Sequence, residues 1–233
     1  MTRLAIIAAA SLLLAGCASF SPDGGFGKVS QLTQERTGQG VALQRSPEDA
    51  QTAQNRVAEL LQAALTADAA VEVALLNNRG LQAKFGDLGI AESELVRAGR
   101  LKNPSLSFGR MSGGGGVEIE RTVLFDILGL LTMPMAKEVG QQRFEQAQYQ
   151  AAYDAVSLAA DVRRAYFDAV AAQELAKFYE QVKETADVSN ELAKRMLQAG
   201  NFNKLAQMRE QAFYADATAQ LARAQHQAAA QRE

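Results

Sequence analysis

Few side chains in this sequence could carry out chemistry of their own. Among 233 residues there is one cysteine, Cys17, and one histidine, His226. The histidine falls on a predicted helix, where a surface position is commoner than a catalytic one. The run from Gly113 to Gly116 lacks the Gly-Lys-Ser/Thr ending of a phosphate-binding loop and does not lead into a helix. We therefore expect neither an enzyme nor a bound cofactor.

Three thioethers near these glycines are the remaining candidate ligands. They belong to Met111, Met133 and Met135. Thioethers favour Cu(I), but scattered methionines more often fill apolar space. We expect no metal site.

Cys17 ends a segment that has the features of an export signal. An arginine near the N-terminus precedes residues 4–15, an apolar run too short to span a bilayer. Leu14-Ala15-Gly16-Cys17 resembles the lipobox of bacterial lipoproteins, in which small residues admit a peptidase and the thiol becomes linked to diacylglycerol. We expect residues 1–16 to be a signal peptide and Cys17 to be the lipidation site. The alternative is a buried cysteine behind an ordinary signal peptide.

The residue after the cysteine indicates the membrane. Ala18 stands where an acid would resemble an inner-membrane retention signal. We expect a protein anchored in the outer membrane and extending into the periplasm.

Composition narrows the fold class. The net charge of −2 and the pI of about 5.6 give no reason to expect a nucleic-acid partner. Aromatic residues make up 6% and alanine is abundant. This favours long, closely packed helices over a compact aromatic core, so we expect a mainly α protein.

The segment before the hairpin divides into a linker and helices. Residues 17–45 are rich in Ser, Gly and Gln, which predicts a lipid-anchored linker. Residues 46–103 predict periplasmic helices. Ser46 and Pro47 have the types of an N-cap and a first helical residue, and this helix should run to about Leu65. Asp68 should cap a second helix over about 69–98.

Residues 104–131 have the period-2 pattern of a β-hairpin. One predicted face is apolar and comprises Leu106, Phe108, Val117, Ile119, Val123 and Phe125. The other face carries the acids Glu118, Glu120 and Asp126, while Arg121 and Leu124 break the alternation. A soluble sheet shows such a pattern, and so does a transmembrane barrel.

Residues 132–233 predict a long helical hairpin. Nothing interrupts the helical pattern between Pro134, expected in the first turn, and Gly200. An alanine-rich seam alternates spacings of four and three at positions 151, 155, 158, 162, 165, 169, 172, 176 and 179. A second apolar stripe comprises Leu175, Phe178, Val182, Leu192 and Met196. Gly200 should end this helix and Asn203 should cap the next, whose inner stripe is expected at Leu205, Met208, Ala212, Ala215, Ala219 and Ala222.

The order of these segments resembles the TolC family of outer-membrane efflux channels, specifically its lipoprotein members. The matching stretches are Ala70 to Asn78, Ala98 to Gly109, Ala165 to Gln173, Ala199 to Asn201, and Arg209 to Tyr214. The resemblance spans residues 46–233. This chain departs from the family at Arg79-Gly80 and Lys102, where prolines are common, and at Ala206 after the turn, where an acid is common.

The resemblance implies a passive conduit. Family members form homotrimers whose strands close a β-barrel in the outer membrane and whose helices continue as a periplasmic tunnel. It implies that Glu118, Glu120 and Asp126 face the lumen, where acids favour cations, and that the apolar face meets lipid. A periplasmic adaptor and an inner-membrane pump are the implied partners. The adaptor would contact the tip at Gly200, Asn201, Phe202, Asn203 and Leu205.

The chain is shorter than the family architecture requires, and its segments also allow a second function. The family has two similar repeats and only the first is present here, so we expect a fragment or a truncated product whose last helix is cut short. A lipid-anchored periplasmic coiled-coil spacer is the alternative function. It accounts for Cys17 and residues 133–233 equally well, but it gives no reason for the hairpin.

Overall fold

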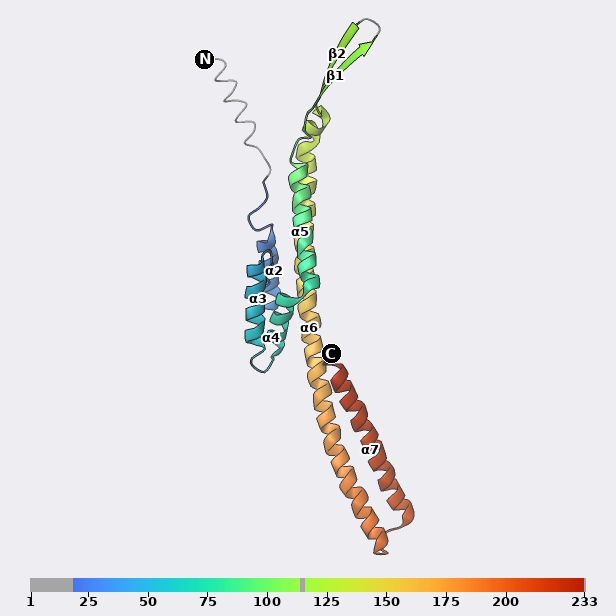
Figure 1. The fold of residues 1–233 in the computed structure, drawn as a ribbon. Coiled ribbons are helices and arrows are strands. Elements are labelled where there is room, and N and C mark those ends of the chain that lie inside the picture. The colour runs from blue at the N-terminus through green and yellow to red at the C-terminus, as the bar shows by residue number, and fades with distance from the viewer. Residues whose placement is uncertain (1–18, 114–115, 233) are drawn as a thin grey trace. The chain divides into compact units, whose positions relative to one another are not determined.

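A computed structural model of the chain describes residues 19–113 and 116–232 and is mainly α-helical, with one two-stranded antiparallel sheet (Figure 1). Its elements are α2 (Phe26–Thr37), α3 (Pro47–Leu60), α4 (Ala67–Asn77), α5 (Arg79–Ala98), β1 (Ser105–Gly113), β2 (Gly116–Leu124), α6 (Ile127–Gln198) and α7 (Lys204–Ala230). The predicted signal peptide and the predicted lipidation site, Cys17, lie outside the described residues. No described helix has an apolar stretch long enough to cross a membrane.

The chain forms two compact units. The first contains residues up to Glu59 together with Leu75–Ser157, and the second contains Leu60–Ala74 together with Leu158–Glu233. The predicted mainly α class with a β-hairpin is confirmed.

Capping explains where the first helices start. Ser46 caps α3, because the Asp49 amide donates to Ser46 Oγ (3.1 Å) and the Ser46 amide donates to Asp49 Oδ2 (3.0 Å). α3 ends at Leu60, short of the expected Leu65. α4 is capped by Thr66, whose Oγ1 accepts from the Ala69 amide (3.1 Å), so the prediction that Asp68 is the cap is wrong.

The expected second helix is two helices. Asn78 interrupts it with an extended backbone, and its side chain accepts from the Leu81 amide (2.9 Å). An Asx cap of this kind competes with helix continuation. The break therefore lies at Asn78.

The predicted linker contains a packed helix. α2 begins beyond Asp23, which accepts from the amides of Gly25 (3.0 Å) and Gly27 (2.8 Å). These bonds are the main reason that the pKa of Asp23 is lowered. Val29 and Thr33 of α2 are fully buried, and the ring of Phe26 packs edge-on against Phe85 at 5.1 Å. The interpretation of residues 17–45 as a linker is thus wrong over α2, because a few apolar residues at helical spacing are enough to dock it.

α5 packs antiparallel along the first part of α6 (Figure 1). Lys84 of α5 forms an ion pair with Asp154 of α6 (3.1 Å). Nearer the other end of α5, a Cβ placed on Gly140 of α6 would meet the Leu95 Cα at 3.3 Å. The glycine allows the two backbones to approach closely. The α5 residues that are buried recur at helical spacing and are Leu81, Phe85, Leu88, Glu92 and Val96.

The second unit holds an antiparallel pair formed by α6 and α7. Ser189 Oγ donates to Glu210 Oε2 (2.6 Å), and Lys183 Nζ lies 5.6 Å from the Tyr214 ring centre. The alanine seam predicted for α6 is buried or half-buried at every position except Ala165. It continues through Ala186, Asn190 and Ala193, which are buried.

The expected inner stripe of α7 is wrong. Leu205, Met208, Ala212, Ala215, Ala219 and Ala222 are all exposed. Tyr214, Ala217, Leu221 and Ala224 face inward instead. Alanines occur at helical spacing on both faces of this helix, so the packing of Tyr214 and Leu221 decides which face is buried.

Candidate functional site

The hairpin separates its side chains by chemistry. Residues opposite each other in an antiparallel pair lie on the same face, and the register pairs Leu106 with Val123 and Arg110 with Ile119. The apolar residues predicted for one face, except Phe125, therefore share it. Glu118 and Glu120 lie on the other face, opposite Met111 and Gly109. The predicted segregation within the strands is confirmed.

The apolar face of the hairpin is open in the single chain. Leu106 is 77% exposed, Phe108 65% and Val123 69%. In the first turns of α6, Leu128 and Leu131 are also exposed. Such a contiguous exposed apolar surface marks a site for a partner or for lipid.

Asp126 is not part of the acidic strand face. β2 ends at Leu124, and Asp126 caps α6, with its Oδ1 accepting from the Gly129 amide (2.7 Å). Its other oxygen pairs with Lys102 Nζ (3.1 Å). The amide bond first and the lysine second lower the pKa of Asp126. The strand assignment of Asp126 and Phe125 is wrong because α6 begins inside the segment expected to be the hairpin.

This early start also changes the setting of Pro134. The proline lies inside α6 and not in its first turn, where it was expected. It cannot donate to the carbonyl of Leu130, so one helical hydrogen bond is missing there. The helix nevertheless continues to Gln198.

The turn between α6 and α7 has the predicted geometry. Gly200 has a φ of 78°, and the Asn201 amide donates to the Met196 carbonyl (2.9 Å), which closes a Schellman C-cap. Asn203 Oδ1 accepts from the Ala206 amide (2.8 Å) and caps α7. Asn201, Asn203 and Leu205 are exposed and Phe202 is half-buried. Four of the five predicted tip residues are thus exposed, in the turn and the first turn of α7.

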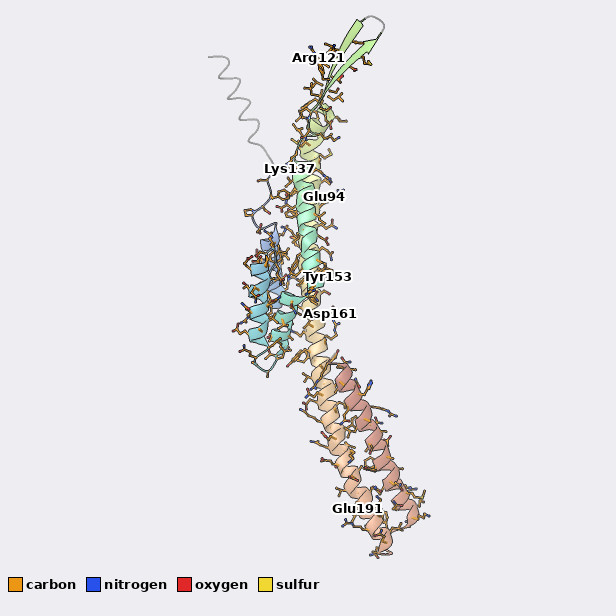
Figure 2. The ribbon with its side chains drawn as sticks, in the orientation of Figure 1. Glu94, Arg121, Lys137, Tyr153, Asp161 and Glu191 are labelled. Carbon is orange, nitrogen blue, oxygen red and sulfur yellow. The ribbon has the colours of Figure 1, made fainter. Side chains whose placement is uncertain are left out.

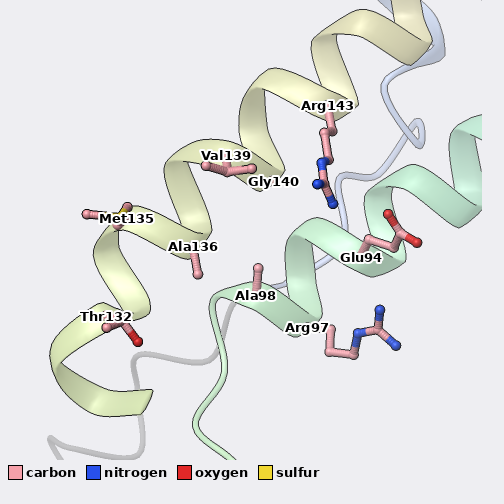
Figure 3. A pocket seen from close by; sticks show the side chains of 9 residues that line it. All are labelled: Glu94, Arg97, Ala98, Thr132, Met135, Ala136, Val139, Gly140 and Arg143. Carbon is pink, nitrogen blue, oxygen red and sulfur yellow. The ribbon is translucent and has the colours of Figure 1, made fainter. Parts of the chain in front are cut away.

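A shallow groove lies between α5 and α6 (Figure 3). Its volume is about 440 Å³, and Arg97, Arg143 and Met135 are among its lining residues. In Figure 3 the Arg143 side chain reaches from α6 toward α5, whereas the Arg97 side chain extends away from α6. Among these described residues, no hydrogen bond or ion pair joins Glu94, Arg97 and Arg143, and we assign no small-molecule site to the groove.

Glu92 ties the N-terminal segment to α5. It is 5% exposed, and its Oε1 accepts from both the amide and the Oγ of Ser21 at 2.5 Å. Arg45 donates to the carbonyls of Pro22 and Asp23, and Gln148 donates to the Gly25 carbonyl (2.9 Å). Sequence reasoning missed this cluster. The only available signal was an acid at a core position of the α5 stripe.

Sequence reasoning also missed Arg110. The register places it on the apolar face, at the position diagonal to Arg121. Figure 2 labels Arg121 on the hairpin. Continuing the β1 alternation by one step beyond Phe108 would have identified Arg110.

The remaining candidate residues do not form a site. His226 is exposed on α7, and Met111 and Met135 are exposed on separate elements. Within the described ranges no group of three or more His, Cys, Asp or Glu side chains could hold a metal ion. No protein-family model, curated protein or solved structure matches this chain.

Proposed function

We propose that this protein is a channel component of an outer-membrane efflux system, a passive conduit that receives substrates from an inner-membrane pump through a periplasmic adaptor. The observation that carries the proposal is the hairpin, which has one apolar and one acidic face and leads within a few residues into a helix of 72 residues. Several copies of such a hairpin would close a barrel with apolar residues outside and carboxylates inside. The resemblance to the TolC family supports the same assembly.

Glu118 and Glu120 would line the lumen in this assembly. Both lie on the face opposite the apolar one, and no basic residue shares their face within the described strands. Carboxylates in a pore wall favour cations. Asp126 does not join them, because it caps α6.

The exposed turn at Gly200 to Leu205 would contact the adaptor. A homotrimer is the assembly that the resemblance implies. A lipid anchor at Cys17 would increase the membrane affinity that the inserted strands provide.

A lipid-anchored coiled-coil spacer is the second candidate. The antiparallel pair of α6 and α7 favours it as much as it favours a tunnel wall. The spacer gives no role to the open apolar face of the hairpin, so we rank it second.

Charge placed on each hairpin face tests the proposal. Leu106→Asp puts an acid on the apolar face opposite Val123, and Ser107→Asp puts the same acid on the polar face opposite Thr122. Phe108 is less suitable, because Arg121 opposite it would pair with an introduced acid. We expect Leu106→Asp to abolish outer-membrane assembly and bilayer conductance, and Ser107→Asp to preserve both.

The spacer predicts a different outcome. In that case both variants assemble equally, no preparation conducts ions, and Cys17→Ser releases a soluble rod. Equal tolerance of the two substitutions would reject the lipid-facing assignment.

A further inference from the structure

The apolar face of the hairpin carries two arginines that nothing on that face neutralises. Its described members are Leu106, Phe108, Arg110, Ile119, Arg121 and Val123. Arg110 and Arg121 occupy diagonal positions, which places their Cβ atoms about 7 Å apart. Both are exposed, and neither forms a hydrogen bond or ion pair with another described residue. The hairpin carboxylates, Glu118 and Glu120, lie on the opposite face.

In a membrane, this arrangement would call for an anion from outside the hairpin. Two guanidinium groups at this separation repel each other, and a neighbouring apolar phase makes each of them costly. An anion that also presents hydrocarbon would satisfy both the arginines and the apolar residues around them. A lipid with an anionic headgroup has this chemistry.

We propose that Arg110 and Arg121 bind the phosphates of anionic lipid headgroups and so set the depth of the hairpin in the membrane. The proposal rests on the membrane insertion of the hairpin proposed above. Guanidinium binds phosphate through paired N–H donors, and its aliphatic stem can lie along apolar surface while the charge reaches the headgroup layer.

The positions of the arginines along the strands agree with this role. At about 3.4 Å per residue, Arg110 lies about 10 Å and Arg121 about 17 Å from the closing pair, Gly113 and Gly116. Between Arg121 and the end of β2 nearest α6, the exposed side chains on this face are apolar and belong to Leu106, Phe108 and Val123. Headgroups at the level of the arginines would leave this apolar part in the hydrocarbon layer.

The test is vesicle flotation of the full chain purified in detergent and diluted. Vesicles consist of phosphatidylcholine alone or of phosphatidylcholine with phosphatidylglycerol. We expect the wild type to bind the anionic vesicles more tightly than the neutral ones. The double variant Arg110→Gln, Arg121→Gln should lower this preference about 30-fold, because each arginine contributes a factor of about 5. The preference should fall with added salt, and lysine at both positions should restore most of it.

A matched control removes the same charge elsewhere. Arg209 and Arg223 are exposed on α7, so Arg209→Gln with Arg223→Gln should leave the preference unchanged. An equal loss in this control would show a general charge effect and overturn the proposal. The proposal is also overturned if the hairpin double variant keeps its preference, or if it alters only self-association, which would assign the arginines to another copy of the chain.

Bilayer conductance separates this proposal from the proposed function. A conducting double variant that has lost its lipid preference supports both. A non-conducting wild type that binds anionic vesicles through Arg110 and Arg121 rejects only the channel.

Discussion

At the scale of single residues, alternation predicted strand faces well but not the end of the strand. Glu118 and Glu120 lie where a period of two places them, because each strand residue points to the face opposite its neighbour. Asp126 continues the same alternation in the sequence, yet it lies beyond β2 and caps α6. A carboxylate at an even position serves equally well as a strand residue or a helix cap, so the pattern cannot distinguish the two roles.

Asp126 gives a testable pH dependence. Its pKa lies below the ordinary value of about 3.9, so the cap is fully stabilising above that value and is lost as the pH falls through the lowered pKa. We expect the hydrogen-exchange protection of the Gly129 amide to fall in acid in the wild type. Asp126→Ala should lack this protection at every pH.

The isosteric variant is the control. Asp126→Asn keeps an oxygen that can accept from Gly129 but cannot titrate. It should retain protection down to low pH, with only the Lys102 pair lost. The same acid-dependent loss in this variant would assign the titration to a different group.

At the scale of elements, small residues decide how closely the helices approach. Gly140 is buried at the contact between α6 and α5, with the Leu95 backbone next to it. Gly86 is exposed on α5, and an added Cβ there meets no atom within 4 Å. Both look alike in the sequence, as glycines within a helical pattern.

Alanine at these two positions should therefore have opposite effects. Gly86→Ala should raise the free energy of unfolding by about 0.5–1 kcal/mol, because alanine costs less backbone entropy in a helix. Gly140→Ala gains the same term but forces the helices apart, and overpacking costs about 1–3 kcal/mol, so we expect net destabilisation. Denaturant unfolding of the two full-length variants measures the difference, and stabilisation by Gly140→Ala would contradict the close contact.

At the scale of the whole molecule, two features matter. One is open apolar surface: Phe178 and Leu192 of the second stripe of α6 are exposed, and the apolar face of the hairpin is exposed as well. A single chain leaves these surfaces uncovered, which supports the proposed assembly. The other is the contact of Glu92 with Ser21, which joins residues 71 positions apart.

The Glu92 contact is testable without any assumption about function. Glu92→Leu removes the acceptor for the Ser21 amide, whereas Glu92→Gln keeps an acceptor oxygen of the same reach. We expect the hydrogen-exchange protection of residues 19–25 to be lost in the leucine variant and largely kept in the glutamine variant. Equal protection in both would mean that Arg45 and Gln148 hold the segment without Glu92. Cys17 lies four positions before Ser21, a reach of about 14 Å, so the contact would also limit where a lipid on Cys17 can insert.

The sequence alone determined the features that depend on neighbours along the chain. The cap of α3 at Ser46, the left-handed turn at Gly200, the cap at Asn203 and the strand faces each depend on a few adjacent residues, and each was predictable. The docking of α2, the buried face of α7 and the placement of Arg110 beside Arg121 were decided only by the tertiary structure. In each of these cases local preference allows two arrangements, and packing or pairing against a distant segment selects one.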